Sequence, residues 1–111
     1  MLKIVRVDFP LLDKPGKVKN RPALCLTPPI GRYSQVIVAP ITSKTGTLVT
    51  SDVVLDVSDA QFSATGLSKT SAIQLHKMVS LGQKRLQGEV GILSDACDEE
   101  VRSKLRAMFQ I

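Results

Sequence analysis

The sequence predicts a mainly β fold, α+β by content, arranged as a small antiparallel barrel with one α-helix at its C-terminal end. Short segments rich in β-branched residues alternate with turn signals through residues 2–81. A convincing helical pattern comes only at the end, where apolar residues repeat at helical spacing: Val101, Leu105, Met108 and Phe109. With 111 residues, of which 43% are hydrophobic, the chain is expected to form a single domain over residues 1–111.

Five strands are expected, most of them bounded by prolines or turn residues. Residues 2–9 alternate between apolar and polar and end at Pro10, and a loop over 11–20 follows with Pro15-Gly16 as its turn. The later strands are expected at 21–27, 34–42, 51–58 and 70–81, the last with a bend near Met78. Pro22 has no N–H to donate, so we expect it at a strand start or at an edge of the sheet.

Charge placement supports the C-terminal helix. Its first turns carry the acids, where the helix dipole favours anions: Asp95, Asp98, Glu99 and Glu100. Its later turns carry the bases, where the dipole favours cations: Arg102, Lys104 and Arg106. A second, short helix over 82–87 is a further option.

Composition limits the function classes. The net charge of +5 fits a polyanionic partner, either a nucleic acid or an acidic protein, and fits a simple solubility margin equally well. Basic residues gather without any acid in "KPGKVKNR", residues 14–21. No apolar run approaches the length of a membrane span, and the N-terminus resembles neither a signal peptide nor an anchor, so no membrane partner is expected. Cys25 and Cys97 lack the spacing of zinc ligands and are expected to be buried thiols of a cytoplasmic protein.

Several stretches then match one family in order: "IVRVDFP", "NRPALCL", "VIVAPITSK" and "SAIQLHKMVSLGQKRL". The chain resembles the MazF/PemK/Kid toxins of type II toxin–antitoxin pairs over roughly residues 3–109. The resemblance implies an SH3-like barrel of the CcdB/MazF type, usually a homodimer. It also implies an endoribonuclease that cuts single-stranded RNA, including mRNA, without a metal or other cofactor, and a cognate antitoxin with an acidic, disordered segment.

The resemblance also assigns site residues. The "RPAL" and "PIT" positions, the recurrent active-site pair of the family, are Arg21 and Thr42 in this chain. The loop before Arg21, residues 10–20, is expected to take part in RNA binding. The fifth expected strand would add polar groups to the site, here Gln74 and His76.

The residue chemistry is compatible with these roles. Arg21 could stabilise charge on a phosphate, His76 could move a proton, and Thr42, or less strongly Ser43, could donate a hydroxyl hydrogen bond. Lys14, Lys17 and Lys19 would then track phosphates. From the residues alone, Arg21 is better explained as an ordinary strand-end charge and Thr42 as an ordinary strand-end threonine, while His76 could equally be a solvated histidine.

The chain departs from the family pattern at three positions. Val79 replaces a common arginine, Gly82 a common aspartate, and Gln74 a common positive charge. These departures predict that Arg21 is the one strongly placed cation of the site. They leave two alternatives open: a same-fold toxin without nuclease activity, such as a gyrase inhibitor of the CcdB type, or an inactive RNA-binding barrel. The scarcity of aromatic residues, 4% of the chain, disfavours a base-stacking RNA-binding barrel.

Overall fold

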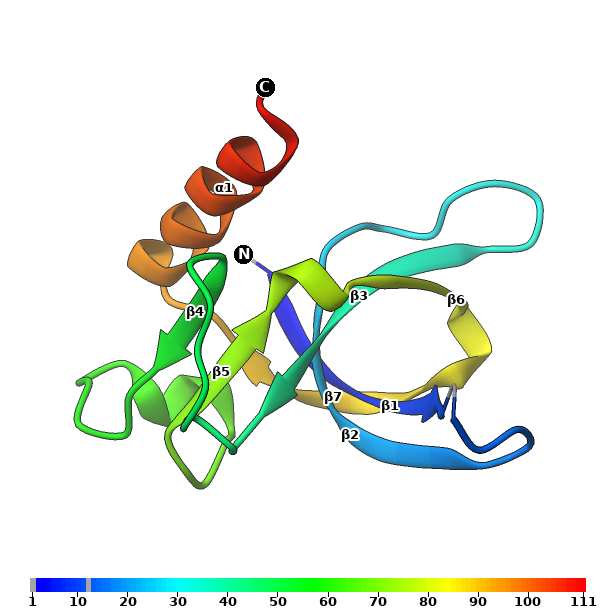
Figure 1. Cartoon of the computed structure of the whole chain (residues 1–111), viewed down its shortest axis with the longest axis horizontal. Helices are drawn as coiled ribbons and strands as arrows, with labels where there is room; N and C mark the ends of the chain where they lie inside the picture. The colour runs from blue at the N-terminus through cyan, green and yellow to red at the C-terminus, as the bar shows by residue number, and fades with distance from the viewer. Residues whose placement is uncertain (1, 12) are drawn as a thin grey trace.

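Seven strands, three 3₁₀ turns and one long helix are present in the computed structural model, which describes residues 2–11 and 13–111. The strands are β1 (Lys3–Pro10), β2 (Val18–Cys25), β3 (Gln35–Thr42), β4 (Asp52–Leu55), β5 (Ser71–Gln74), β6 (Val79–Gly82) and β7 (Leu86–Ile92). The 3₁₀ turns are η1 (Phe62–Thr65), η2 (Leu75–Lys77) and η3 (Gln83–Arg85), and the helix is α1 (Asp95–Phe109). The predicted class, mainly β and antiparallel with a C-terminal helix, is confirmed (Figure 1).

The strands form one antiparallel sheet that curls into a small barrel. Its order is β4-β5-β3-β2-β1-β7, and β6 also pairs with β3. Because β7 pairs with β1 while η3 joins β7 to β6, the chain closes a ring around β1, β2, β3, β6 and β7 (Figure 1). Strands β4 and β5 extend the sheet beyond this ring, on the side where α1 packs.

Two apolar cores lie on the opposite faces of the sheet. Alternation along β1 sends Ile4 to one core and Val5 to the other, and alternation along β2 does the same with Leu24 and Ala23. The first core is covered by α1 through Val101, which is fully buried. The second core fills the barrel ring and includes Val7, Phe9, Val36, Val38 and Leu81.

The strand expected at 70–81 is wrong as one element, because the structure divides it into β5, η2 and β6. Both strands pair with the same edge of β3: β6 pairs Val79 with Val38, and β5 pairs Ile73 with Ile41. The registers of β5 and β6 against β3 differ by three residues, and the 3₁₀ turn η2 between β5 and β6 accommodates this shift. Pro40, which has no N–H for a ladder, lies in β3 between the two pairings. The expected bend therefore occurs just before Met78.

Other boundaries also differ from expectation. Strand β2 begins at Val18, so the predicted loop over 11–20 is shorter; Leu12 of that loop lies outside the described residues. Pro22 lies inside β2, but pairing with β3 begins only at Ala23, so Pro22 is at a local edge of the sheet as predicted. Strand β4 covers only residues 52–55 of the expected 51–58. The short helix expected at 82–87 is the 3₁₀ turn η3, and β7 after it was not predicted.

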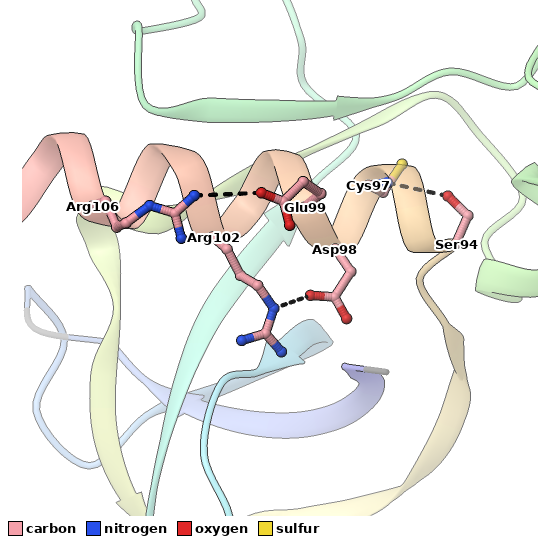
Figure 2. Close-up of polar contacts among 6 residues, drawn as sticks. All are labelled: Ser94, Cys97, Asp98, Glu99, Arg102 and Arg106. Carbon is pink, nitrogen blue, oxygen red and sulfur yellow. Dashed lines mark hydrogen bonds and ion pairs between the residues drawn. The ribbon is translucent and has the colours of Figure 1, made fainter.

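The C-terminal helix begins and is charged as expected (Figure 2). The Ser94 hydroxyl accepts a hydrogen bond from the Cys97 N–H at 3.2 Å, which caps the first turn. Asp98 and Arg102 pair across one turn at 2.6 Å, and Glu99 and Arg106 pair across two turns at 3.4 Å (Figure 2).

The apolar face of α1 is buried only in part. Leu105 and Met108 pack at the edge of the first core, whereas Phe109, which the helical spacing places on the same apolar face, is 57% exposed. The end of the helix projects past the sheet (Figure 1). Cys25 and Cys97 are free thiols and half-buried. Within the described part of the chain, no helix has the length and apolar character needed to cross a bilayer.

Candidate active site

The N-terminal part of β2 and the C-terminal end of β3 form one wall of a polar hollow, here called the Arg21 pocket. The β2–β3 register pairs Ala23 with Pro40. Pairing ends there, and Arg21 and Thr42, each two residues farther along, are on the same face of their strands as this pair and both line the pocket. The pocket has a volume of about 650 Å³ and is lined by Lys19, Arg21, Thr42, Ser43, Lys44, Gly46, Thr47, Val49, Asp52, Gln74, His76 and Lys77.

The face of β2 that fills the barrel core becomes cationic at its N-terminal end. Ala23 is fully buried in the second core, while Arg21 is half-buried and Lys19 is exposed on the same face. The Arg21 guanidinium lies over the ring of Phe9, with Cζ 5.9 Å from the ring centroid. Phe9 is itself buried, so this contact restrains Arg21 at the boundary between the core and the pocket.

Thr42 ends β3 with its hydroxyl fixed by the turn that follows. Its Oγ1 accepts a hydrogen bond from the Lys44 N–H at 3.1 Å. Because this bond uses only a lone pair, the hydroxyl proton remains free to donate to a ligand in the pocket. The same bond holds the turn that contains Ser43 and places Lys44 at the pocket wall.

The interruption after β5 brings His76 to the pocket. Gln74 is the last residue of β5, and His76 follows in η2, which is closed by a 3.1 Å hydrogen bond from the Met78 N–H to the Leu75 carbonyl. Leu75 anchors the turn in the first core, while His76 and Lys77 are exposed. Both His76 and Gln74 line the pocket, but His76 lies in a turn and not in the strand expected over 70–81.

Asp52 is a pocket residue that the sequence reading did not single out. It begins β4 opposite Gln74, and its side chain is only 3% exposed. Its Oδ2 accepts a hydrogen bond from the Val49 N–H at 3.0 Å, and its Oδ1 lies 3.6 Å from His76 Nδ1. The Lys104 ammonium of α1 donates to its backbone carbonyl. A signal was available: no acidic residue occurs between Asp13 and Asp52.

The pocket is strongly cationic. Among the described residues that line it, the side chains with a fixed positive charge are Lys19, Arg21, Lys44 and Lys77, and the only carboxylate is that of Asp52. The expectation that Arg21 is the one well-placed cation is therefore wrong. Lys44 and Lys77 lie in stretches that match the family, "VIVAPITSK" and "SAIQLHKMVSLGQKRL", but were not singled out as site residues.

Not every predicted binding residue lies here. Lys14 and Lys17 belong to the exposed turn between β1 and β2 and do not line the pocket. The Lys17 N–H donates to the Lys14 carbonyl at 3.0 Å, so the turn has its own hydrogen bonding. No group of three His, Cys, Asp or Glu side chains within residues 2–11 and 13–111 is arranged to hold a metal ion.

Comparisons with known proteins agree with this architecture. The model of one protein family, described as the PemK-like, MazF-like toxin of type II toxin-antitoxin system, matches residues 2–109. Among solved structures, the chain is similar to the Mycobacterium tuberculosis toxin MazF-mt6, with a TM-score of 0.72 and 23% sequence identity over 98% of this chain and 97% of that chain. No curated protein matches the chain.

Two further solved structures share the fold. One is an endoribonuclease in complex with its cognate antitoxin from mycobacterial species, with a TM-score of 0.70 and 17% identity over 98% of this chain and 92% of that chain. The other is described as an Mtb toxin, with a TM-score of 0.66 and 19% identity over 95% of this chain and 98% of that chain. The predicted small barrel with a C-terminal helix, of the MazF type, is thereby confirmed.

Proposed function

Because the family model covers residues 2–109, this chain belongs to the PemK-like, MazF-like toxins of type II toxin–antitoxin systems, and we propose that it cleaves single-stranded RNA in the Arg21 pocket. Toxins of this family are endoribonucleases. One observation carries the proposal for this chain: the pocket gathers four fixed cations, a hydroxyl donor and the only histidine of the sequence. Such a lining suits a phosphodiester and a proton transfer.

The proposed reaction uses the nucleophile that RNA itself carries. The 2′-oxygen attacks the adjacent phosphorus, the new O–P bond forms, and the bond from phosphorus to the 5′-oxygen breaks. The products are a 2′,3′-cyclic phosphate and a free 5′-hydroxyl. The protein must take up the 2′-hydroxyl proton and stabilise the extra negative charge on the phosphorane.

Each of these tasks has a residue in the pocket. Arg21, restrained by Phe9, makes the charge-assisted contact with the non-bridging phosphate oxygens. Thr42 donates its free hydroxyl proton to the same phosphate, with Ser43 beside it. His76 takes the 2′-hydroxyl proton, and water that reaches the open pocket protonates the leaving 5′-oxygen.

The remaining polar groups bind the strand on either side of the reacting phosphate. Lys19, Lys44 and Lys77 supply attraction to phosphates that does not depend on base identity. Gln74 can both donate and accept, which suits a contact with a base or a sugar. Lys14 and Lys17 lie outside the pocket, where they can meet only a longer RNA.

The family also supports two partners. We propose that the toxin is neutralised by a cognate antitoxin whose acidic segment covers the cationic pocket, and that the chain works as a homodimer. The net charge of +5 supports electrostatic steering of an acidic segment. One structural neighbour is an endoribonuclease in complex with its cognate antitoxin.

The test is cleavage of a long single-stranded RNA by the purified chain in EDTA, with the ends of the products mapped. We expect discrete cuts with 2′,3′-cyclic phosphate ends. We expect Arg21→Ala to slow cleavage by about 10³-fold or more, as for other residues that stabilise a transferring phosphoryl group.

The matched control is Arg32→Ala. Arg32 also lies over an aromatic ring, 5.8 Å from the Tyr33 centroid, but does not line the pocket. The Arg32→Ala variant should cut RNA at the wild-type rate. If folded wild-type protein cuts nothing, the chain is a binding module of the same fold and the nuclease proposal is wrong. If Arg21→Ala cuts as fast as Arg32→Ala, the chain is a nuclease but Arg21 does not take part in cleavage.

A further inference from the structure

The two carboxylate oxygens of Asp52 differ in their hydrogen bonding, which is unusual for a buried group. Its Oδ2 is satisfied by the Val49 N–H, but its Oδ1 is buried and has no hydrogen-bond partner among residues 2–11 and 13–111. A buried, unsatisfied carboxylate oxygen costs free energy, so such a group is rarely left without a compensating partner. The ionisable group that lies against it is the imidazole of His76, with Nδ1 at 3.6 Å from Oδ1.

The two residues differ in how firmly they are held. Asp52 begins β4, pairs with Gln74 in the sheet, and has its backbone carbonyl bound by Lys104 of α1. His76 is in the three-residue turn η2, with a side chain 39% exposed. A separation of 3.6 Å is slightly too long for a hydrogen bond, and a small movement of the turn closes it. The carboxylate is therefore the fixed member and the imidazole the adjustable one.

We infer that Asp52 is a positioning residue for His76, an inference that rests on the proposed ribonuclease function. The carboxylate accepts the Nδ1 proton of the neutral imidazole, so the lone pair that can take a proton is on Nε2, the nitrogen turned away from Asp52. A carboxylate that orients a catalytic imidazole in this way is a recurrent device in enzymes.

The charges around the pair are compatible with this role. The cations Lys19, Arg21, Lys44 and Lys77 line the same pocket, and Lys104 approaches Asp52 from α1. A carboxylate offers acceptor oxygens and no donor, so a hydrogen bond between the pair requires that the facing nitrogen of His76 carries the proton.

A purely structural role for Asp52 makes a different prediction. If Asp52 only holds the turn before β4, a substitution that keeps this turn should leave the tautomer of His76 unchanged. Its Oδ2 and its N–H both bond to Val49, at 3.0 Å each, and so hold the turn before β4. In Asp52→Asn the amide oxygen can keep the bond from the Val49 N–H. The amide NH₂ then faces His76 Nδ1 and donates to it, which moves the imidazole proton to Nε2. Asp52→Asn therefore preserves the turn before β4 and moves the proton of the neutral His76 imidazole from Nδ1 to Nε2.

The experiment reads the tautomer directly by ¹⁵N NMR of the imidazole in the full-length chain. His76 is the only histidine, so its signals need no assignment. Spectra are recorded at about pH 8.5, well above the ordinary pKa of histidine, so that a neutral ring is observed. We expect the Nδ1–H form in the wild type and the Nε2–H form in Asp52→Asn, and a loss of RNA cleavage of about 10²-fold.

Asp56→Asn is the matched control. Asp56 also holds a turn through its carboxylate, which accepts from the Ser58 N–H at 2.9 Å, but it does not line the pocket. This variant should change neither the tautomer nor the cleavage rate.

The outcomes separate the inference from the proposed function. An Nε2–H ring in the wild type overturns the inference without any variant, as does the same tautomer in wild type and Asp52→Asn. If the tautomer inverts but the wild type cuts no RNA, Asp52 positions His76 and the ribonuclease proposal fails. Inversion together with the expected loss of cleavage supports both.

Discussion

The two ends of β2 open into hollows of similar size and opposite character. At the N-terminal end is the Arg21 pocket, of about 650 Å³. At the C-terminal end is a second hollow of about 570 Å³, here called the Cys25 hollow, lined by Leu2, Lys3, Val5, Cys25, Leu26, Thr27, Pro28, Pro29, Val36, Gln83, Leu86, Gly88 and Glu89. Volume alone does not distinguish a candidate active site from a gap at the mouth of a barrel.

Charge does distinguish the two hollows. In the Cys25 hollow, the one lysine, Lys3, lies 2.8 Å from the carboxylate of Glu89, so the two formal charges of the lining offset each other. In the Arg21 pocket, four cations face one buried carboxylate. The same strand therefore borders a hollow of balanced charge at one end and a cationic hollow, the candidate site for an anion, at the other. The predictions below test whether that contrast decides function.

Among the variants that compare the two hollows, the largest effect is expected from Thr42→Val, which keeps the shape of the side chain and removes its hydroxyl. Cleavage of RNA should fall by about 10²-fold, the scale for loss of one hydrogen-bond donor to a developing anion. Thr42→Ser, which keeps the donor, should retain most of the activity. The measurement is the single-turnover cleavage rate for each variant.

The Cys25 hollow supplies a close control. Thr27 lines that hollow, and its Oγ1 accepts a hydrogen bond from the Ile37 N–H at 3.1 Å, the same length as the bond from the Lys44 N–H to Thr42. Thr27→Val therefore loses an equivalent backbone contact without touching the Arg21 pocket. An equal loss of cleavage in both variants would mean that loss of a backbone contact, and not loss of a donor in the Arg21 pocket, lowers the rate.

A smaller effect is expected from the lysines of the two hollows. Lys19→Ala and Lys44→Ala should each weaken binding of a single-stranded 2′-deoxy oligonucleotide, which lacks the nucleophile, by a few-fold. Each should also reduce the slope of log affinity against log salt by about one. Lys3→Ala should change neither quantity, because its charge is offset by Glu89. Equal losses for Lys3 and Lys19, measured by fluorescence anisotropy, would contradict the contrast between the hollows.

Much of the fold could be predicted because each element carries its own local signal. The alternation of apolar and polar residues predicts β1, and the β-branched residues predict β3. Acids in the first turns and bases in the later turns support α1. The division of residues 70–81 into two strands has no such signal, because it depends on Pro40, a residue distant in sequence that lies between the two pairings. Strand β7 was missed because its Gly88 and Gly91 weaken the strand pattern.

The site residues likewise divide into those that sequence motifs predict and those that only the folded chain brings together. Arg21 and Thr42 could be named from ordered motifs, and the pairing of β2 with β3 explains why two residues so far apart in sequence line the same pocket. Asp52 could not be assigned a partner from sequence, because its closeness to His76 arises from the β4–β5 pairing and from the turn η2. The sequence likewise gave no reason to separate Lys19 from Lys14 and Lys17, since only the start of β2 decides which lysine faces the pocket.

The smallest effect concerns the ion pair that closes the Cys25 hollow. The hydrogen bond and the charge of Glu89 raise the pKa of Lys3 above its usual value. A raised pKa means that the folded state binds the proton more tightly than the unfolded state, so the stabilisation is present below the ordinary lysine pKa, about 10.4, and is lost as pH rises through the higher folded value. The Lys3–Glu89 pair is exposed, so its contribution to the free energy of unfolding should be small.

A double-mutant cycle with Lys3→Met and Glu89→Gln measures that contribution from urea midpoints at about pH 7 and about pH 11. We expect weak positive coupling at the lower pH and less at the higher pH. A coupling that persists unchanged at the higher pH would mean that packing, and not charge, joins the two residues. Lys3 would then be a free cation, and the Cys25 hollow would differ from the Arg21 pocket only in the number of its positive groups.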